Sequence, residues 1–312
     1  MKLAKELLKV SFIIPTLNSE RTLGECLQSI VNQSYPFKEV IIVDGGSKDS
    51  TISIALKYTS QILIVKGGIG KARQVGAANS KGEILGIFDS DIILPSRDWL
   101  SKAIKPFVND SKVGIVWPIN KAPNTASCVS KCYFNLWATF FNKRQIENKA
   151  ILPGGNSLVL RRAFTEAGGF NSTLHYGEDF DLMYRILRLG YKVVIHKEPI
   201  IHNTMRSMKE FARKQFLGAK TIFEAQKRNA TELNLLYACL TWTASKGKLR
   251  MIDYIKYAFA EHIMLGLNAM FKNFLKDKSW LVFPFLALIR IIIYSLFFLL
   301  YSANKVMKSI LQ

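Results

Sequence analysis

The sequence predicts an α/β protein with a mostly parallel central sheet flanked by helices, followed by an α-helical, membrane-associated C-terminal region. Three observations support this fold class. Short apolar runs alternate with helix-like segments in the first hundred residues, which is typical of a parallel sheet. Polar residues follow several of these runs, at the carboxyl ends of the predicted strands, and ligands of parallel sheets bind at those ends. Nearly every residue from Trp280 to Tyr301 is apolar.

The expected elements follow one another in a regular order. Strands are predicted at residues 10–14, 39–43, 62–65 and 84–88, with helices at 19–33, 52–58 and 71–80 between them. Asp49, Ser50 or Thr51 is the candidate N-cap of the second helix. The pattern is less regular after residue 91. A strand is expected at 157–160, a helix at 177–189 that Gly190 ends, and a last strand at 191–195.

Polar residues gather at the carboxyl ends of the predicted strands. Asn18, Asp44 and the pair Asp89 and Asp91 each stand at or just beyond such an end. In a strand, residues i and i+2 point to the same side, so Asp89 and Asp91 can reach one divalent cation. The other ligands of that cation would be phosphate oxygens. Taken alone, such a pair is also ordinary turn chemistry exposed to solvent.

The C-terminal third of the chain is both basic and apolar. The formal net charge of the chain is +20, and residues 201–312 hold 17 Lys and Arg against 6 Asp and Glu. Basic charge beside an apolar run favours an anionic membrane rather than nucleic acid as the partner. From Ser207 onward, the chain has the pattern of basic amphipathic helices.

The apolar run at residues 280–301 is long enough to cross a membrane once. As a helix it would span about 33 Å at ~1.5 Å per residue. Arg290 lies in its middle and Pro284 interrupts its first half. A re-entrant or interfacial helix is therefore the alternative to a crossing.

The cysteines and the N-terminus indicate a reducing compartment. Cys26, Cys128, Cys132 and Cys239 form no C-x-x-C pair and no cluster with histidine, so neither a zinc site nor a disulfide framework is expected. Cys26 lies in the apolar stripe of the first helix and is expected in the core. The charged N-terminus does not resemble a signal peptide. We therefore expect the first domain in the cytosol.

Six short motifs occur in a set order along the chain. They are Pro15-Thr16-Leu17-Asn18-Ser19-Glu20, Val43-Asp44-Gly45-Gly46-Ser47-Lys48-Asp49-Ser50-Thr51, Gly70-Lys71-Ala72-Arg73, Asp89-Ser90-Asp91, Gly154-Gly155-Asn156 and Gly177-Glu178-Asp179. Together they resemble the family 2 inverting glycosyltransferases, which have the nucleotide-sugar-binding A-type fold. The resemblance covers residues 10–205.

This resemblance implies a binding site for the nucleotide-sugar donor. Asp44 would hydrogen-bond the base, and the Arg73 guanidinium would contact the diphosphate. Asp91 would be the metal ligand, with Asp89 as a supporting contact to the ribose or sugar and as a second ligand, and Mn²⁺ or Mg²⁺ would neutralise the diphosphate as it leaves. His202 would complete the metal shell or touch a phosphate, unless it is a surface histidine. The full donor-binding set is Pro15, Thr16, Asn18, Glu20, Asp44, Gly45, Ser47, Gly70, Arg73, Asp89, Ser90 and Asp91.

The resemblance also implies a catalytic acidic pair, Glu178 and Asp179. An inverting transfer needs a base that takes the proton of the acceptor hydroxyl, and Asp179 is the expected base. Glu178 and Asp181 are alternatives, and so is a carboxylate that merely stabilises a helix N-terminus. Gly154, Gly155 and Asn156 are expected to contact the acceptor or sugar, or else to form a structural turn.

One feature of the family's processive synthases is missing. Those enzymes carry a Q-x-x-R-W motif after the acidic pair, whereas residues 209–216 of this chain read Lys-Glu-Phe-Ala-Arg-Lys-Gln-Phe. Transfer of a single sugar is therefore favoured. The acidic pair favours a hydroxyl acceptor on a lipid-linked or membrane-proximal molecule, because a polyprenyl phosphate is already anionic. Synthesis of a polyprenyl- or dolichyl-phosphate sugar, nucleotidyl transfer and a non-catalytic membrane scaffold that binds nucleotide are the rival functions.

These expectations divide the chain into four segments. Residues 1–205 would form the nucleotide-sugar-binding catalytic domain, on the cytoplasmic side because nucleotide sugars are made there. Residues 206–278 would form basic amphipathic helices at the membrane interface. Residues 279–302 would be a transmembrane or membrane-embedded helix, and residues 303–312 a basic tail.

Overall fold

The computed structural model describes residues 8–146, 154–172, 174, 177–228 and 262–310. The chain forms two compact units that interrupt each other in sequence. The first comprises residues 1–121 and 152–203, and the second comprises residues 122–151 and 204–312. The segment at 122–151 thus groups with the C-terminal part of the chain, which no sequence pattern indicated.

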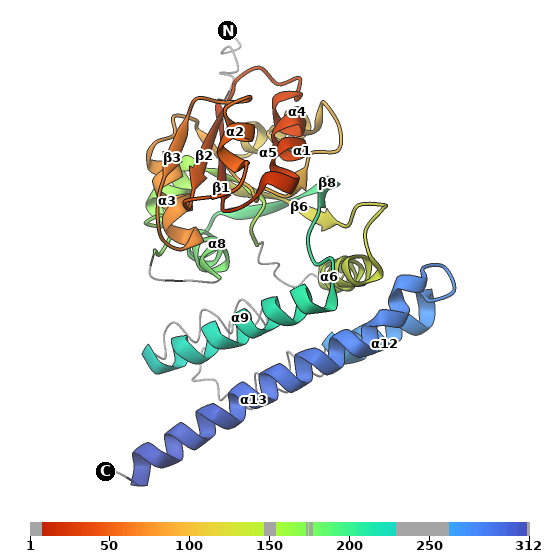
Figure 1. Cartoon of the computed structure of the whole chain (residues 1–312). Coiled ribbons are helices and arrows are strands. Elements are labelled where there is room, and N and C mark those ends of the chain that lie inside the picture. The colour runs from red at the N-terminus through yellow and green to blue at the C-terminus, as the bar shows by residue number, and fades with distance from the viewer. Residues whose placement is uncertain (1–7, 147–153, 173, 175–176, 229–261, 311–312) are drawn as a thin grey trace. The chain divides into compact units, whose positions relative to one another are not determined.

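The first unit is built on one mixed sheet of eight strands (Figure 1). The strand order is β3-β2-β1-β4-β7-β6-β8-β5. The pairs β3–β2, β2–β1, β1–β4 and β6–β8 are parallel, whereas β4–β7, β7–β6 and β8–β5 are antiparallel. The strands are β1 (Val10–Thr16), β2 (Lys38–Asp44), β3 (Ile62–Ile64), β4 (Ile84–Ile87), β5 (Ile92–Ile93), β6 (Val113–Lys121), β7 (Ser157–Leu160) and β8 (Lys192–His202).

Helices cover both faces of this sheet, which confirms the α/β class. Phe12 and Ile14 of β1 share a core with Leu23 of α1. Ile13, which points to the opposite face, lies against α3, where a Cβ at Gly76 would come within 2.4 Å of the Ile13 side chain. Strands buried on both faces are nearly continuous apolar runs, as β1 and β4 are. The helices of this unit are α1 (Glu20–Val31), α2 (Thr51–Ala55), α3 (Ile69–Ala78), α4 (Trp99–Ala103), α5 (Lys105–Asn109), α7 (Arg161–Glu166) and α8 (Glu178–Arg188).

Some predicted boundaries are wrong. The helix expected to reach residue 58 ends at Ala55, and its N-cap Ser50 makes no side-chain capping bond. Asp49 accepts the Thr51 N–H instead. The last strand runs seven residues past its predicted end, to His202, because its second half pairs with β5 and the end of β6.

The second unit is helical. It contains α6 (Cys128–Ile146), α9 (Met208–Arg228), α12 (His262–Asn273), the 3₁₀ helix η2 (Lys278–Val282) and α13 (Phe283–Ile310). The predicted interruption of the apolar helix at Pro284 is wrong. The helix α13 begins one residue before Pro284, and proline is tolerated in the first turn of a helix. The buried core of this unit consists of Val129, Cys132, Met205, Phe211, Ala269, Trp280, Phe283 and Leu286.

Candidate active site

The carboxyl ends of β1 and β2 are joined around a buried aspartate. Asp44 is fully buried and lies beside Thr16 in the parallel register. Its carboxylate accepts hydrogen bonds from the Thr16 hydroxyl (2.9 Å) and from the backbone N–H groups of Gly46 (2.8 Å) and Ser47 (2.7 Å). Burial acts to raise the pKa of Asp44, but the hydrogen bonds from Ser47, Thr16 and Gly46 outweigh it and hold the pKa below its ordinary value. Asp44 is therefore an ionised anchor for the loop that follows β2.

Other residues of the expected donor-binding set join the two loops after β1 and β2. Asn18 has a left-handed backbone (φ 49°), donates its N–H to the Ser47 hydroxyl and accepts from the Lys48 N–H. Glu20 accepts the Ser50 N–H (3.0 Å). Gly45 donates its N–H to the Thr16 carbonyl. These contacts fix the shape of the sheet edge at which β1, β2 and β4 end.

Arg73 connects the two acidic motifs. Its side chain is 3% exposed, and its guanidinium donates to Asp89 Oδ1 at 2.7 Å and to Glu178 Oε1 at 2.5 Å. The sequence predicts a contact between Arg73 and the donor diphosphate, but here both terminal nitrogens hold carboxylates of the chain itself. Gly70, one turn earlier on α3, permits this approach, since a Cβ there would lie 3.2 Å from Glu178 Cγ.

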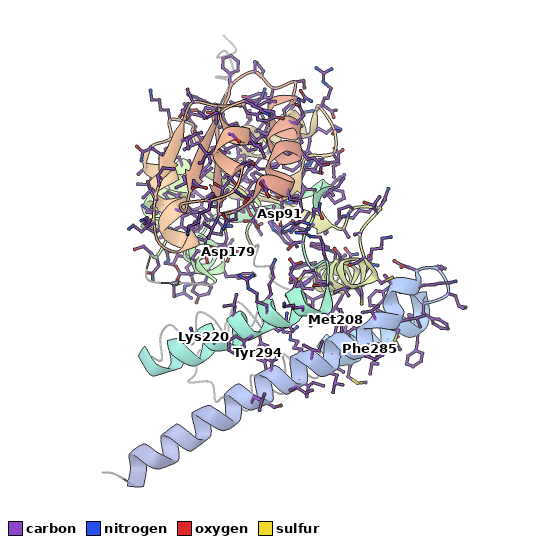
Figure 2. The ribbon with its side chains drawn as sticks, viewed as in Figure 1. Asp91, Asp179, Met208, Lys220, Phe285 and Tyr294 are labelled. Carbon is purple, nitrogen blue, oxygen red and sulfur yellow. The ribbon has the colours of Figure 1, made fainter. Side chains whose placement is uncertain are left out.

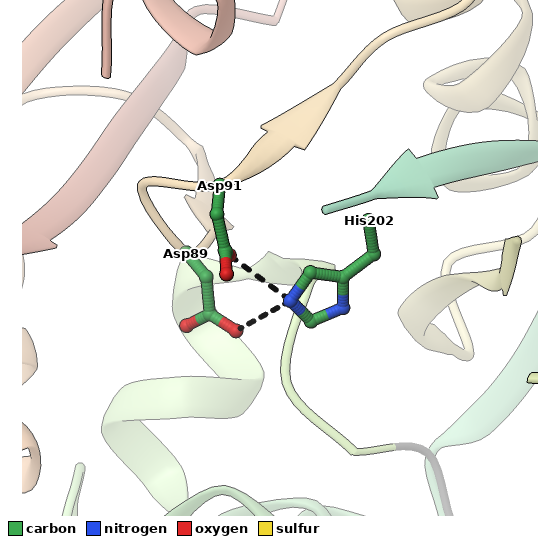
Figure 3. A group of neighbouring side chains, drawn as sticks. All are labelled: Asp89, Asp91 and His202. Atoms are coloured by element: carbon green, nitrogen blue, oxygen red, sulfur yellow. Dashed lines mark ion pairs between the residues drawn. The ribbon is translucent and has the colours of Figure 1, made fainter. Parts of the chain in front are cut away.

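Asp89, Asp91 and His202 form a cluster in which one oxygen or nitrogen of each lies within 4.8 Å of the others (Figure 3). His202 Nε2 lies 3.0 Å from Asp91 Oδ1 and 3.7 Å from Asp89 Oδ2. The antiparallel pairing of β5 with β8 brings His202 opposite Ile92, next to Asp91, and the Asn203 N–H binds the Asp91 carbonyl at 2.8 Å. Ser90, between the two aspartates, donates its hydroxyl to that of Ser19.

This cluster fits a divalent cation. Two carboxylates and an imidazole are ordinary ligand types for such an ion, and their separations allow all three to reach one centre. Each side chain is partly exposed, with fractions of 12% to 29%, so the remaining coordination positions are open to phosphate oxygens or water.

Asn156 contacts two residues of the cluster, Asp89 and His202. It is 2% exposed and has a left-handed backbone (φ 63°). Its side-chain oxygen accepts the Asp89 N–H at 2.8 Å, and its amide nitrogen lies 3.4 Å from Asp89 Oδ2, from His202 Nδ1 and from Asn120 Oδ1. The sequence predicts Asn156 as a contact to the acceptor or sugar, and in the structure its buried amide lies against Asp89 and His202. No local pattern indicated Asn120.

The second acidic pair lies at the first turn of α8. Asp179 is half-buried and accepts the Gly155 N–H at 2.6 Å. Gly154 and Gly155 allow this approach, since a Cβ at either would lie within 3.6 Å of Asp179 Oδ2. Burial raises the pKa of Glu178 to about 7; the Arg73 charge opposes the rise and Asp179 adds to it. Asp181 forms an ion pair with Arg185 at 2.5 Å.

The mixed sheet with helices on both faces agrees with the A-type fold of nucleotide-sugar-dependent glycosyltransferases. The model of "Glycosyl transferase family 2" matches residues 11–168, just over half of the chain. The protein therefore belongs to glycosyltransferase family 2, whose members use nucleotide-sugar donors.

Known proteins agree with this placement. Glycosyltransferase AglE of Haloferax volcanii is 26% identical over 244 residues, which cover 75% of this chain and 79% of AglE. Two solved structures share the fold. One is the mannosyltransferase PcManGT from Pyrobaculum calidifontis in complex with GDP-Man and Mn²⁺ (TM-score 0.58, 19% identity, 92% of this chain and 87% of that one). The other is S. aureus TarS 1-349 in complex with UDP-GlcNAc (TM-score 0.51, 18% identity, 95% and 92%).

Proposed function

We propose that this protein is an inverting glycosyltransferase that moves one sugar from a nucleotide-diphosphate donor to a hydroxyl group of a lipid-linked or membrane-proximal acceptor, with Mn²⁺ or Mg²⁺ bound. The observation that carries this proposal is the cluster of Asp89, Asp91 and His202, joined by Arg73 to the acidic pair on α8. A cation site next to a potential base is what this reaction requires. The complexes of PcManGT with GDP-Man and Mn²⁺ and of TarS with UDP-GlcNAc support the class of donor.

The three side chains of the cluster would hold the cation. Bound there, a divalent ion acts as a Lewis acid that stabilises the charge developing on the diphosphate. Asp91 and His202 lie closest together, and Asp89 would contribute the oxygen that Arg73 does not occupy. The Asn156 amide would keep Asp89 and His202 in place.

Asp179 is the proposed base. Glu178 is held by Arg73 and Asp181 by Arg185, so both alternatives are engaged in ion pairs. Gly155 orients Asp179 through its N–H. In the transfer, Asp179 takes the proton of the acceptor hydroxyl, the acceptor oxygen bonds to the sugar C1, and the C1–O bond to the nucleoside diphosphate breaks. Attack opposite the leaving group inverts the configuration at C1.

We further propose that the protein works at a membrane, with residues 1–205 as the catalytic domain on its cytoplasmic side. The basic, apolar C-terminal region supports the membrane. The cytosolic origin of nucleotide sugars supports the side. A membrane-bound acceptor would then be within reach of a catalytic domain attached to the same surface.

The experiment separates donor binding from turnover in the full-length chain. A panel of UDP-, GDP- and dTDP-sugars is tested with Mn²⁺ by thermal shift, and release of nucleoside diphosphate is then measured. Asp91→Ala should abolish the metal-dependent shift. Asp179→Asn should keep the shift and lose most turnover, and Asp98→Asn, which removes an exposed carboxylate elsewhere, should change neither.

Three outcomes would contradict the proposal. The absence of a thermal shift with every nucleotide sugar would contradict the proposed donor-binding site. Full turnover by Asp179→Asn on a polyprenyl phosphate would point to polyprenyl-phosphate sugar synthesis instead. Release of inorganic diphosphate would identify a nucleotidyl transfer.

A further inference from the structure

The helices of the second unit expose a continuous apolar stripe. Its members along η2 and α13 are spaced four, three, four and four residues apart, which places them on one helical face. Between residues 281 and 296, whose side chains the structure describes, the other exposed positions are Pro284 and Ser295, so no charge interrupts the stripe. The stripe consists of Leu281 (54% exposed), Phe285 (61%), Leu288 (54%), Ile292 (49%) and Leu296 (55%).

The opposite face of α13 is occupied by protein. Trp280, Phe283 and Leu286 are buried in the core of the second unit, and α13 packs along α9. Arg290 is half-buried, with its guanidinium 5.6 Å from the ring of Tyr294. Figure 2 labels Tyr294 on α13. The helix α9 carries exposed Lys209 and Arg213. The two faces of α13 therefore differ sharply: one is apolar and exposed, and the other is packed against a charged helix.

Lysines accompany the stripe where α12 leads into η2. Lys272, Lys276 and Lys278 are exposed, and two large apolar side chains between or beside them, Phe271 (69%) and Leu275 (84%), are exposed as well. The single acidic residue in 263–296 is Asp277. Its carboxylate is engaged by Asn135 Nδ2 at 2.8 Å and by the Ser279 N–H at 2.9 Å.

We propose that this face is a membrane-binding surface that lies in the plane of an anionic bilayer. The stripe would enter the boundary between head groups and acyl chains, and Lys272, Lys276 and Lys278 would contact lipid phosphates. The length and composition of 278–296 also suit a crossing helix. A crossing would, however, carry α9 and its charged side chains into the acyl region, which has no water to solvate them.

This inference deepens the membrane attachment of the proposed function, but its tests use no sugar donor. Failure of membrane binding and failure of sugar transfer are therefore seen in separate assays. An apolar stripe could instead bind a second copy of the chain, and the experiments below distinguish this case from membrane binding.

The first experiment measures sedimentation of the full-length chain with lipid vesicles. Vesicles of phosphatidylcholine are compared with vesicles of equal parts phosphatidylcholine and phosphatidylglycerol. Changing the three lysines together to glutamine should weaken binding to the anionic vesicles by roughly 100-fold, about fivefold per residue, and leave neutral vesicles little affected. Phe285→Glu with Leu288→Glu should abolish binding to both. Leu56→Glu is the matched control, because Leu56 is also 61% exposed but lies in the first unit.

The second experiment measures depth in the bilayer. A fluorophore is attached at Phe285→Cys or at Leu296→Cys, and quenchers attached to the lipids report its depth. Each variant also carries Cys128→Ser and Cys239→Ser, so that only the new cysteine is labelled. Cys26 and Cys132 are buried and are left unchanged. The two sites are 11 residues apart, or about 16 Å along the helix axis. Equal, shallow depths support an in-plane helix. A depth difference approaching that distance would overturn it. The Phe285→Glu, Leu288→Glu variant gives a second way to overturn the proposal. If it binds vesicles as the wild type does, and light scattering shows that it has lost a dimer that the wild type forms, the stripe binds a second copy of the chain.

Discussion

Replacing Arg73 with methionine tests whether this residue joins the two acidic motifs. Methionine fills a similar volume but has no charge, so Asp89 and Glu178 lose the cation to which both are bound. Removing one partner of a buried ion pair typically costs 3–5 kcal/mol, because the other charge is left without compensation. Here the side chain of Glu178 is 4% exposed, whereas that of Asp89 is 29% exposed and can be solvated. We therefore expect the low end of the range, about 3 kcal/mol.

The cost should depend on pH in a defined direction. The pKa of Glu178 is already about 7 and would rise further without the opposing charge of Arg73. Below that pKa, Glu178 takes up a proton and the uncompensated charge disappears. The destabilisation by Arg73→Met should therefore be largest above pH 7 and shrink as the pH falls toward 5.

Urea unfolding of the full-length chain, followed by circular dichroism of the first unit's sheet signal, gives the free energies. The matched control is Arg162→Met, because Arg162 lies 2.7 Å from Glu166 but is 78% exposed, and its loss should not be measurable. Adding Glu178→Gln to Arg73→Met should restore part of the unfolding free energy that Arg73→Met removes. Equal effects of the two arginine changes, or no coupling between Arg73 and Glu178, would refute the bridging role.

Three further predictions concern the same site. Asn156→Ala should weaken Mn²⁺ binding by roughly 10–100-fold, measured by electron paramagnetic resonance titration, because its amide holds two cluster residues; unchanged affinity would exclude an outer-shell role. The pKa of Glu178 is raised from 4.5, so its stabilising contribution is complete below pH 4.5 and is lost as the pH rises through about 7. The unfolding free energy of wild type minus that of Glu178→Gln should thus fall across this window, and a flat difference would contradict the raised pKa. Gly70→Ala should destabilise the chain by about 1–3 kcal/mol in chemical unfolding, since its Cβ would crowd Glu178 and the Asn171 carbonyl; a neutral change would show that α3 can shift.

The sequence predicted the first half of the sheet well because the signals there are local. Each strand there is three to seven residues long and contains a short apolar run, and each helix begins within a few residues of a turn. Parallel strands joined by helices place their carboxyl ends at one edge, so the positions of Asn18, Asp44 and Asp89 could be inferred together. Their hydrogen-bond partners could not, because Thr16 meets Asp44 only through the register of two strands.

The second half of the sheet depends on contacts between distant residues. The strands β6, β7 and β8 pair in both directions, and no local pattern selects one direction over the other. The extension of β8 to His202 follows from pairing with β5, more than a hundred residues earlier. From the sequence, His202 is a candidate ligand only because it follows the last predicted strand. Its position beside Asp91 became visible only in the folded chain.

The two oxygens of Asp89 explain why the acidic motifs belong to one site. Oδ1 binds Arg73, which also holds Glu178, while Oδ2 faces His202. A cation bound to Oδ2 would draw electron density from the same carboxylate that neutralises Arg73. Arg73 would then compensate Glu178 more fully. Among the described residues, the Asp91 carboxylate lies against His202 and the Asp91 carbonyl accepts the Asn203 N–H, and neither contact involves Arg73. Loss of Asp91 should therefore be confined to cation and donor binding, whereas loss of Asp89 should also disturb the packing around Glu178.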